Sequence, residues 1–345
     1  MKLRNLALSA GATVAVLLVA LAAALAFGGP TPPKAMQSIS DPFKNVDFSA
    51  LPPLDHYGAR DGTQLAYRRY APADKHASRG SVVLVHGSSA NSESMHPLAQ
   101  SFAQAGFTAY ALDMRGHGDS GPHGDIAYIG QLDDDLEDFL QAVRPSAPKT
   151  LLGFSSGGGF VIRVAGGTRQ TLFDNFLFMA PYTNRRAPNY RPDAGGWVSV
   201  GVPRLVALTL LNRVGITSLN HLHIVDFAVN AGIANRTPEA QLTPWYSYAL
   251  MKNFQPLEDY QRDIRDIHEP AAVLVGKNDE VFIADKFAQV FADAGRPDIP
   301  VILVPDTGHI ALTLAPAARA AAVSAIERLD GGTPPVALDA RASRP

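Results

Sequence analysis

The chain of 345 residues contains no cysteine, and this absence excludes several kinds of chemistry. Disulfide bonds, cysteine zinc sites, a thiol nucleophile and a lipid-modified amino-terminal cysteine are all ruled out. The chain also lacks an excess of charge of either sign, since its formal net charge is -2 at pH 7. That balance gives no electrostatic reason to expect a nucleic acid partner.

The remaining composition is that of a folded protein with a large core. Apolar residues make up 46% of the chain and charged residues 18%, a balance too apolar for a disordered protein. At this length, one large α/β domain with an inserted subdomain fits as well as two domains do.

The amino terminus has the features of a targeting or membrane segment. Lys2 and Arg4 precede an uncharged, mostly apolar run over residues 6–27. As a helix this run would extend about 33 Å, compared with about 30 Å for the hydrocarbon core of a bilayer. Residues 24–26, Ala-Leu-Ala, also fit a signal cleavage site. We therefore predict that residues 1–27 form a membrane anchor or a signal peptide. The protein would then be exported, either anchored in the inner membrane and facing the periplasm or outside, or secreted after cleavage.

Short apolar segments alternate with helix-like segments through most of the chain. Asp61-Gly62 marks a hairpin turn, and proline-rich residues 28–54 and terminal residues 331–345 predict a linker and a flexible tail. The predicted strands lie at residues 81–85, 107–112, 150–154, 175–180, 271–275 and 301–304, and the predicted helices at 92–105, 131–143, 284–294 and 314–329. This alternation predicts an α/β fold whose mostly parallel sheet is covered by helices on both faces.

One interval interrupts the alternation. Residues 182 to about 266 separate two predicted strands and form a connection far longer than usual. The interval contains the apolar stretch 198–211 and an aromatic cluster around Trp245. We predict an inserted helical cap at about 183–266, within a domain that spans residues 55–330.

A glycine-flanked serine follows the strand at residues 150–154. The sequence Gly153-Phe154-Ser155-Ser156-Gly157 matches the G-x-S-x-G motif, in which a strand turns sharply into a helix and exposes the serine hydroxyl. Side chains at the flanking glycines would collide in so tight a turn. A purely structural glycine-rich turn is one alternative, and a phosphate-binding loop is another, although no Walker-type lysine follows. The pattern predicts Ser155 as a nucleophile.

A serine nucleophile needs a base and an acid that orients the base. In this motif's fold the chain order is serine, then aspartate or glutamate, then histidine. His309 follows the strand at 301–304 and Asp279 follows the strand at 271–275, so both lie past strand carboxyl ends. We predict that His309 is the base and that Asp279 orients it.

Other acidic residues and histidines fit these roles less well. Glu280 would point away if Asp279 points inward, Asp306 shares a loop with His309, and Asp285 lies in a predicted helix. The histidines expected to be structural or to face substrate are His86, His221, His223 and His268. Because no cluster of metal-binding side chains is apparent, we expect no metal.

An oxyanion formed during the reaction needs backbone N–H donors. The residue after the nucleophile, Ser156, supplies one such amide in this motif. The second is expected from the loop after the strand at 81–85, which reads His86-Gly87-Ser88-Ser89. We predict Ser88 as that donor.

The stretch Asp113-Met114-Arg115-Gly116-His117-Gly118-Asp119-Ser120 is similar to the D-x-R-G-x-G-x-S loop of a known family. Together with the other motifs, it resembles the α/β-hydrolase family, specifically its monoacylglycerol lipase, lysophospholipase and serine aminopeptidase-like branch, over roughly residues 55–330. The resemblance implies the α/β-hydrolase fold, no cofactor, and a structural role for the Asp113–Ser120 loop. The elbow at residues 153–159 also resembles that of cofactor-free haloperoxidase-like members.

These observations lead us to expect a serine hydrolase that cleaves carboxylic esters through an acyl-enzyme. The apolar cap and the expected membrane location favour a small ester or a lipid, such as a monoacylglycerol or lysophospholipid. An aminopeptidase-like hydrolase is the alternative, and it would need acidic cap groups such as Glu239, Glu258 and Asp259 to hold a substrate amine. A catalytically silent ligand-binding scaffold would require a missing catalytic residue. The sequence gives no indication of the oligomeric state.

Overall fold

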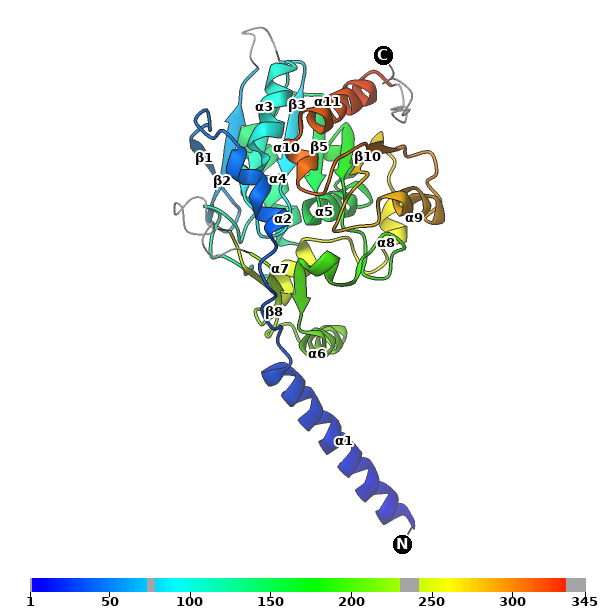
Figure 1. Ribbon diagram of the computed structural model, residues 1–345. Helices are drawn as coiled ribbons and strands as arrows, with labels where there is room; N and C mark the ends of the chain where they lie inside the picture. The colour runs from blue at the N-terminus through cyan, green and yellow to red at the C-terminus, as the bar shows by residue number, and fades with distance from the viewer. Residues whose placement is uncertain (1, 73–77, 230–241, 333–345) are drawn as a thin grey trace.

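A computed structural model describes residues 2–72, 78–229 and 242–332, which include an eight-stranded central sheet (Figure 1). Its strand order is β1-β2-β4-β3-β5-β6-β10-β11. The bounds are β1 Leu54–Gly58, β2 Gln64–Tyr70, β3 Ser81–Val85, β4 Thr108–Leu112, β5 Lys149–Phe154, β6 Asn175–Met179, β10 Ala271–Gly276 and β11 Val301–Val304. β2 runs antiparallel to β1 and β4, and the other neighbouring strands pair in parallel. The predicted mostly parallel α/β fold is confirmed.

Two groups of helices flank this sheet, which explains why its central strands are apolar along their whole length. α3 (His96–Gln104) and α11 (Pro316–Asp330) form one group with the short α10 (Ala311–Leu314). Arg319 of α11 donates hydrogen bonds to the Pro97 carbonyl and the Ser101 hydroxyl of α3. α4 (Gln131–Val143), α5 (Ser156–Ala165) and α9 (Phe287–Asp293) complete the body.

The Asp113–Ser120 loop connects the β1–β2 hairpin to α4. The Arg115 guanidinium makes a bidentate pair with Asp135, with N–O distances of 2.8 and 2.7 Å, and a third bond to Asp61 at 2.9 Å. Arg115 and Asp135 are both buried. Because an unpaired charge in such a place is costly, the geometry gives this loop a structural role.

We predict that Arg115→Met lowers the free energy of unfolding by about 3–5 kcal/mol, because it leaves the Asp135 carboxylate buried without its cation. Urea unfolding followed by circular dichroism measures the change. Arg262→Met is the matched control, since Arg262 forms an exposed pair with Asp266 at 3.4 Å and its loss costs less than about 1 kcal/mol. Equal losses in the two variants would contradict the structural role of the buried pair.

A cap lies between β6 and β10 and carries both strands and helices. Its three-stranded antiparallel sheet has the order β7 (Val198–Val200), β8 (His223–Phe227) and β9 (Trp245–Ser247). Its helices are α6 (Val202–Arg213), α7 (Tyr248–Asn253) and α8 (Tyr260–Arg265). The prediction of a helical cap omitted this sheet, because the three strands are only three to five residues long and pair across distant parts of the insertion. Figure 1 shows β8 and α6 below the main sheet.

The amino-terminal helix α1 (Lys2–Phe27) projects from the molecule beyond α6 (Figure 1). Among the described residues, no helix is both long enough and apolar enough to cross a bilayer. This finding contradicts the predicted membrane anchor and the exported location, anchored or secreted, that depended on it.

Residues 28–54, predicted to be a linker, lie against the body. They form α2 (Gln37–Ser40) and the short 3-10 helix η1 (Asp41–Asn45). The Met36 amide donates to the Ala228 carbonyl of the cap at 3.0 Å, and Ile39 and Phe43 pack against the core. This segment therefore bridges the cap and the body.

Candidate active site

The turn between β5 and α5 holds Ser155 in a strained backbone conformation. Its φ of 55° and ψ of -120° lie in a region that residues with a side chain rarely adopt. The Ser155 amide donates to the Met179 carbonyl of β6, and its own carbonyl accepts from the Tyr182 amide. A Cβ on Gly157 would collide with the His86 carbonyl, and one on Gly153 would collide with the Gly157 carbonyl. The two glycines of the motif are therefore required by close packing of backbone.

The structure brings Ser155, His309 and Asp279 together, as the sequence predicts. His309 Nε2 lies 3.0 Å from Ser155 Oγ, and His309 Nδ1 lies 2.8 Å from Asp279 Oδ2. The other Asp279 oxygen accepts from the amides of Val281 and Phe282 at 2.9 and 2.7 Å. All three catalytic candidates are buried. With its Nδ1 proton directed to Asp279, His309 keeps Nε2 available to accept the Ser155 proton.

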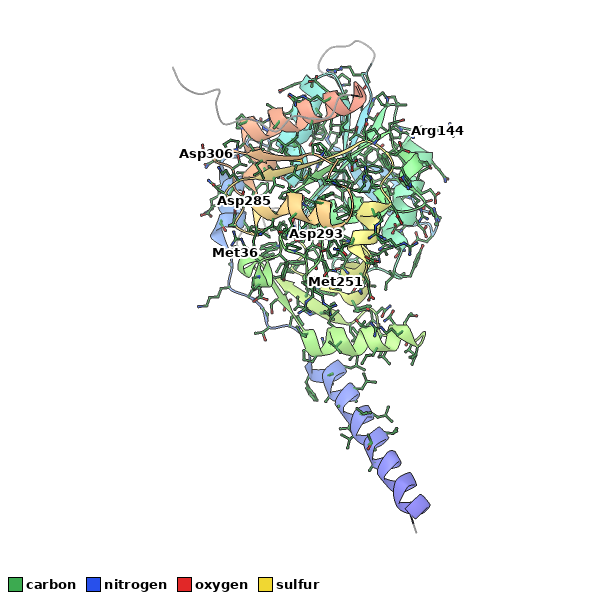
Figure 2. The ribbon with its side chains drawn as sticks, turned by 90° about the vertical axis from the view of Figure 1, so that its right-hand side faces the viewer. Met36, Arg144, Met251, Asp285, Asp293 and Asp306 are labelled. Atoms are coloured by element: carbon green, nitrogen blue, oxygen red, sulfur yellow. The ribbon has the colours of Figure 1, made fainter. Side chains whose placement is uncertain are left out.

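The competing acidic residues lie elsewhere. Glu280 accepts a hydrogen bond from the His309 amide at 2.8 Å, so it supports the backbone of the histidine loop rather than the imidazole. This supporting contact has no local signal in the sequence. Asp285 and Asp306 are exposed at the periphery (Figure 2).

The predicted oxyanion residues Ser88 and Ser156 line the same cavity as Ser155. The loop that carries Ser88 is held by the cap. Trp197 Nε1 donates to Ser88 Oγ at 2.9 Å, the Ser89 amide donates to Tyr246 Oη at 2.8 Å, and the Thr243 amide donates to the Ser89 carbonyl at 2.8 Å. Ser89 has a φ of 67°, so these bonds hold a strained position.

Two buried histidines, His86 and His117, support this loop through hydrogen bonds. His86 Nε2 accepts from the Met114 amide at 3.2 Å, which leaves its Nδ1 proton to donate to the Gly87 carbonyl at 2.8 Å. His117 Nε2 lies 2.5 Å from Tyr246 Oη. Burial lowers the pKa of His86 to about 4 and lowers the pKa of His117 well below its ordinary value. Both imidazoles are therefore neutral, and Tyr246 Oη donates to His117 while it accepts from Ser89.

The other histidines and the cap acids have local partners. His223 pairs with Asp226, His221 contacts the Ser218 carbonyl, and His268 lies at the protein surface away from Ser155. Glu258 pairs with Lys252 at 3.3 Å, and Asp259 caps α8 by accepting from the Arg262 amide. Glu239 lies outside the described residues. Within the described ranges, no group of three or more histidine, aspartate or glutamate side chains is arranged to hold a metal ion.

We predict that Tyr246→Phe lowers kcat about tenfold with little change in KM. The variant removes the acceptor of the Ser89 amide and leaves a buried donor unpaired, a loss of about 1–3 kcal/mol that falls on the oxyanion loop. Steady-state kinetics on a simple ester measures the effect. Tyr128→Phe, which removes an exposed hydroxyl bonded to Asp134, is the control. A kcat equal to that of the unaltered protein would exclude a positioning role for Tyr246.

We also predict that the free energy of unfolding decreases as the pH falls from about 6.5 to about 4. The unfolded chain binds a proton on His86 near its ordinary pKa of 6.5, whereas the folded chain resists protonation until about pH 4. The stability that the neutral imidazole contributes is complete above pH 6.5 and is lost on acidification, by about 3 kcal/mol. Urea titrations of the unaltered chain and of His86→Gln, at matched pH values, test this. Parallel curves for the two proteins would contradict it.

Comparison with known proteins agrees with the fold and the motifs. The family of serine aminopeptidase, S33, matches residues 76–313. The chain is 39% identical over 106 residues to a monoacylglycerol lipase of Mycolicibacterium smegmatis, a match that covers 29% of this chain and only 36% of that protein. It is 27% identical over 259 residues to non-heme chloroperoxidase CPO-A1 of Kitasatospora aureofaciens, covering 68% of this chain and 86% of that one.

A solved structure shows the same fold. The soluble variant of monoglyceride lipase from Saccharomyces cerevisiae, in complex with a substrate analog, superposes with a TM-score of 0.61 at 17% identity. The superposition covers 84% of this chain and 99% of that chain. The resemblance inferred from the sequence motifs is therefore confirmed at the level of family and fold.

Proposed function

Because the chain belongs to the serine aminopeptidase S33 family of α/β-hydrolases, we propose that it is a serine hydrolase that cleaves carboxylic esters with Ser155, His309 and Asp279. The observation that carries this proposal is the continuous relay of hydrogen bonds, 3.0 Å from Ser155 to His309 and 2.8 Å from His309 to Asp279. We place the reaction in a hydrolase domain over residues 55–330, with the cap at about 183–266 and a tail at 331–345.

The proposed reaction has two halves that each return the histidine to its neutral state. Ser155 Oγ attacks the ester carbonyl while His309 Nε2 takes its proton, and the amides of Ser156 and Ser88 stabilise the oxyanion. The C–O bond to the alcohol breaks as His309 gives that proton to the departing oxygen, leaving an acyl-enzyme. Water then attacks the acyl carbon as His309 takes its proton, and His309 gives that proton to Ser155 Oγ as the acyl bond to Ser155 breaks and the acid leaves.

The acyl half of the substrate has a suitable site beneath the cap. A cavity of about 810 Å³ extends from Ser155 and Ser156 to the apolar side chains Val202, Val206 and Leu210 of α6. These three side chains are 42%, 52% and 50% exposed, so the cavity reaches the molecular surface at α6. This apolar lining supports a lipase-like or lysophospholipase-like preference for esters with an alkyl acyl chain.

Aminopeptidase activity is less well supported. Glu258 and Asp259 do line the cavity, but both are engaged, the first with Lys252 and the second with the amino end of α8. These two carboxylates are therefore not free to hold a substrate amine, and the apolar lining at α6 favours the ester reaction.

We predict that a fluorophosphonate labels Ser155 and that Ser155→Ala abolishes both labelling and ester hydrolysis. Loss of the nucleophile lowers kcat by about 10⁶ in such enzymes. Mass spectrometry of the adduct and hydrolysis of p-nitrophenyl esters of increasing acyl length provide the measurements. Ser324→Ala, at an exposed position of α11, is the matched control. A folded Ser155→Ala protein with full esterase activity, or an unlabelled Ser155, would defeat the proposal and favour a silent ligand-binding scaffold.

A further inference from the structure

Ser155 lines two cavities. Besides the cavity beneath α6, a smaller one of about 330 Å³ lies between the amino-terminal segment 36–48 and the loop at residues 87–94. Met36 lines the smaller cavity and Met251 lines the larger one, and the two lie apart at the level between the body and α6 (Figure 2). The smaller cavity is within the size range of ligand sites, with room for about ten water molecules.

The position of His309 distinguishes the two cavities. When the ester bond breaks, the alcohol oxygen takes its proton from His309 Nε2, so the alcohol must lie on the histidine side of Ser155. His309 lines the smaller cavity together with Ser155, whereas the larger cavity is lined by Ser155 and the oxyanion residue Ser156. The proton path therefore directs the alcohol to the smaller cavity and the acyl chain to the larger one.

The walls of the smaller cavity are mainly apolar. Met36, Ile39, Phe43 and Phe48 contribute from the amino-terminal segment, and Val229 and Leu242 from the cap. Its charged residues are Glu93, which is partly buried, and Lys44, which is half-exposed and pairs with Asp41 at 2.6 Å. An alcohol with an apolar body would contact the apolar side chains of these walls directly.

The polar side chains around this cavity mostly have partners within the protein. Ser94 Oγ donates to the Asn91 carbonyl, Thr313 Oγ1 donates to the Ile310 carbonyl, and Ser88 Oγ accepts from Trp197. Among the described residues, Ser89 Oγ is buried in this wall without a hydrogen-bond partner. A glycerol group would bring two free hydroxyls to a wall whose polar side chains are mostly engaged, and an unpaired buried hydroxyl weakens binding about tenfold or more.

We infer that this cavity selects esters whose alcohol has an apolar body, such as a benzyl group, over esters of glycerol. The inference rests on the proposed ester hydrolysis and specifies the alcohol half of its substrate. Segment 36–48, which forms one wall of this cavity, lies before residue 76, where the family match begins.

The test compares methyl, benzyl and glyceryl esters of hexanoic acid, each rate being divided by the hydroxide-catalysed rate of the same ester. We expect kcat/KM for the benzyl ester to exceed that for the glyceryl ester by about tenfold or more. Phe43→Ala should lower the benzyl-to-methyl ratio several-fold, because it removes an apolar wall of the smaller cavity. Leu140→Ala, which alters α4 and lines neither cavity, should leave the ratio unchanged.

Leu210→Ala in the larger cavity provides the reciprocal test. It should weaken the preference for long acyl chains and leave the benzyl-to-methyl ratio unchanged. A glyceryl ester cleaved as fast as the benzyl ester, or an alcohol ratio that responds to Leu210→Ala and not to Phe43→Ala, would overturn the inference while ester hydrolysis stands. If no ester is cleaved and Ser155 stays unlabelled, the proposed function fails as well.

Discussion

The close approach of backbone at the Ser155 turn is the constraint on which the rest of the site depends. Gly157 lies against the His86 carbonyl and Gly153 lies against the Gly157 carbonyl, with no room for a Cβ at either position. This contact fixes the start of α5 against the end of β3, and the hydrogen bond from the Ser155 amide to the Met179 carbonyl fixes it against β6. The strained φ of Ser155 persists because these neighbouring strands over-determine it. The order of the parallel strands is thus part of what holds Ser155 in place.

The cap is as much a support for the site as a cover over it. Trp197 comes from one part of the insertion and Thr243 and Tyr246 from another, and each bonds to Ser88 or Ser89. The hydroxyl of Tyr246 extends this support to His117, whose neutrality depends on burial. A change in the cap can therefore reach the oxyanion loop without touching the Ser155–His309–Asp279 relay. The hydrogen bonds among Ser89, Tyr246 and His117 can therefore support both the fold and the proposed oxyanion site.

The sequence was most informative where local patterns carry the structure. The strands, the glycine-flanked turn and the order of Ser155, Asp279 and His309 follow from short motifs and their spacing. Tyr246 could not be found in this way, because its bond to Ser89 joins residues 157 positions apart. The small cap sheet and the packing of segment 36–48 also depend on distant partners. The apolar amino-terminal run led to a prediction of membrane anchoring that the described helices contradict.

Family membership and substrate choice reside in different parts of this chain. The matched region, residues 76–313, contains the turn at Ser155, the loop of His309 and the loop of Ser88, which carry the residues of the proposed reaction. The smaller cavity takes one wall from this region and the other from segment 36–48, which precedes it. Because the alcohol must approach His309 through that cavity, a segment outside the matched region can change selectivity without altering the chemistry. A substrate assigned from the family alone would overlook this wall, and the physical test of the alcohol half has to be made on this chain.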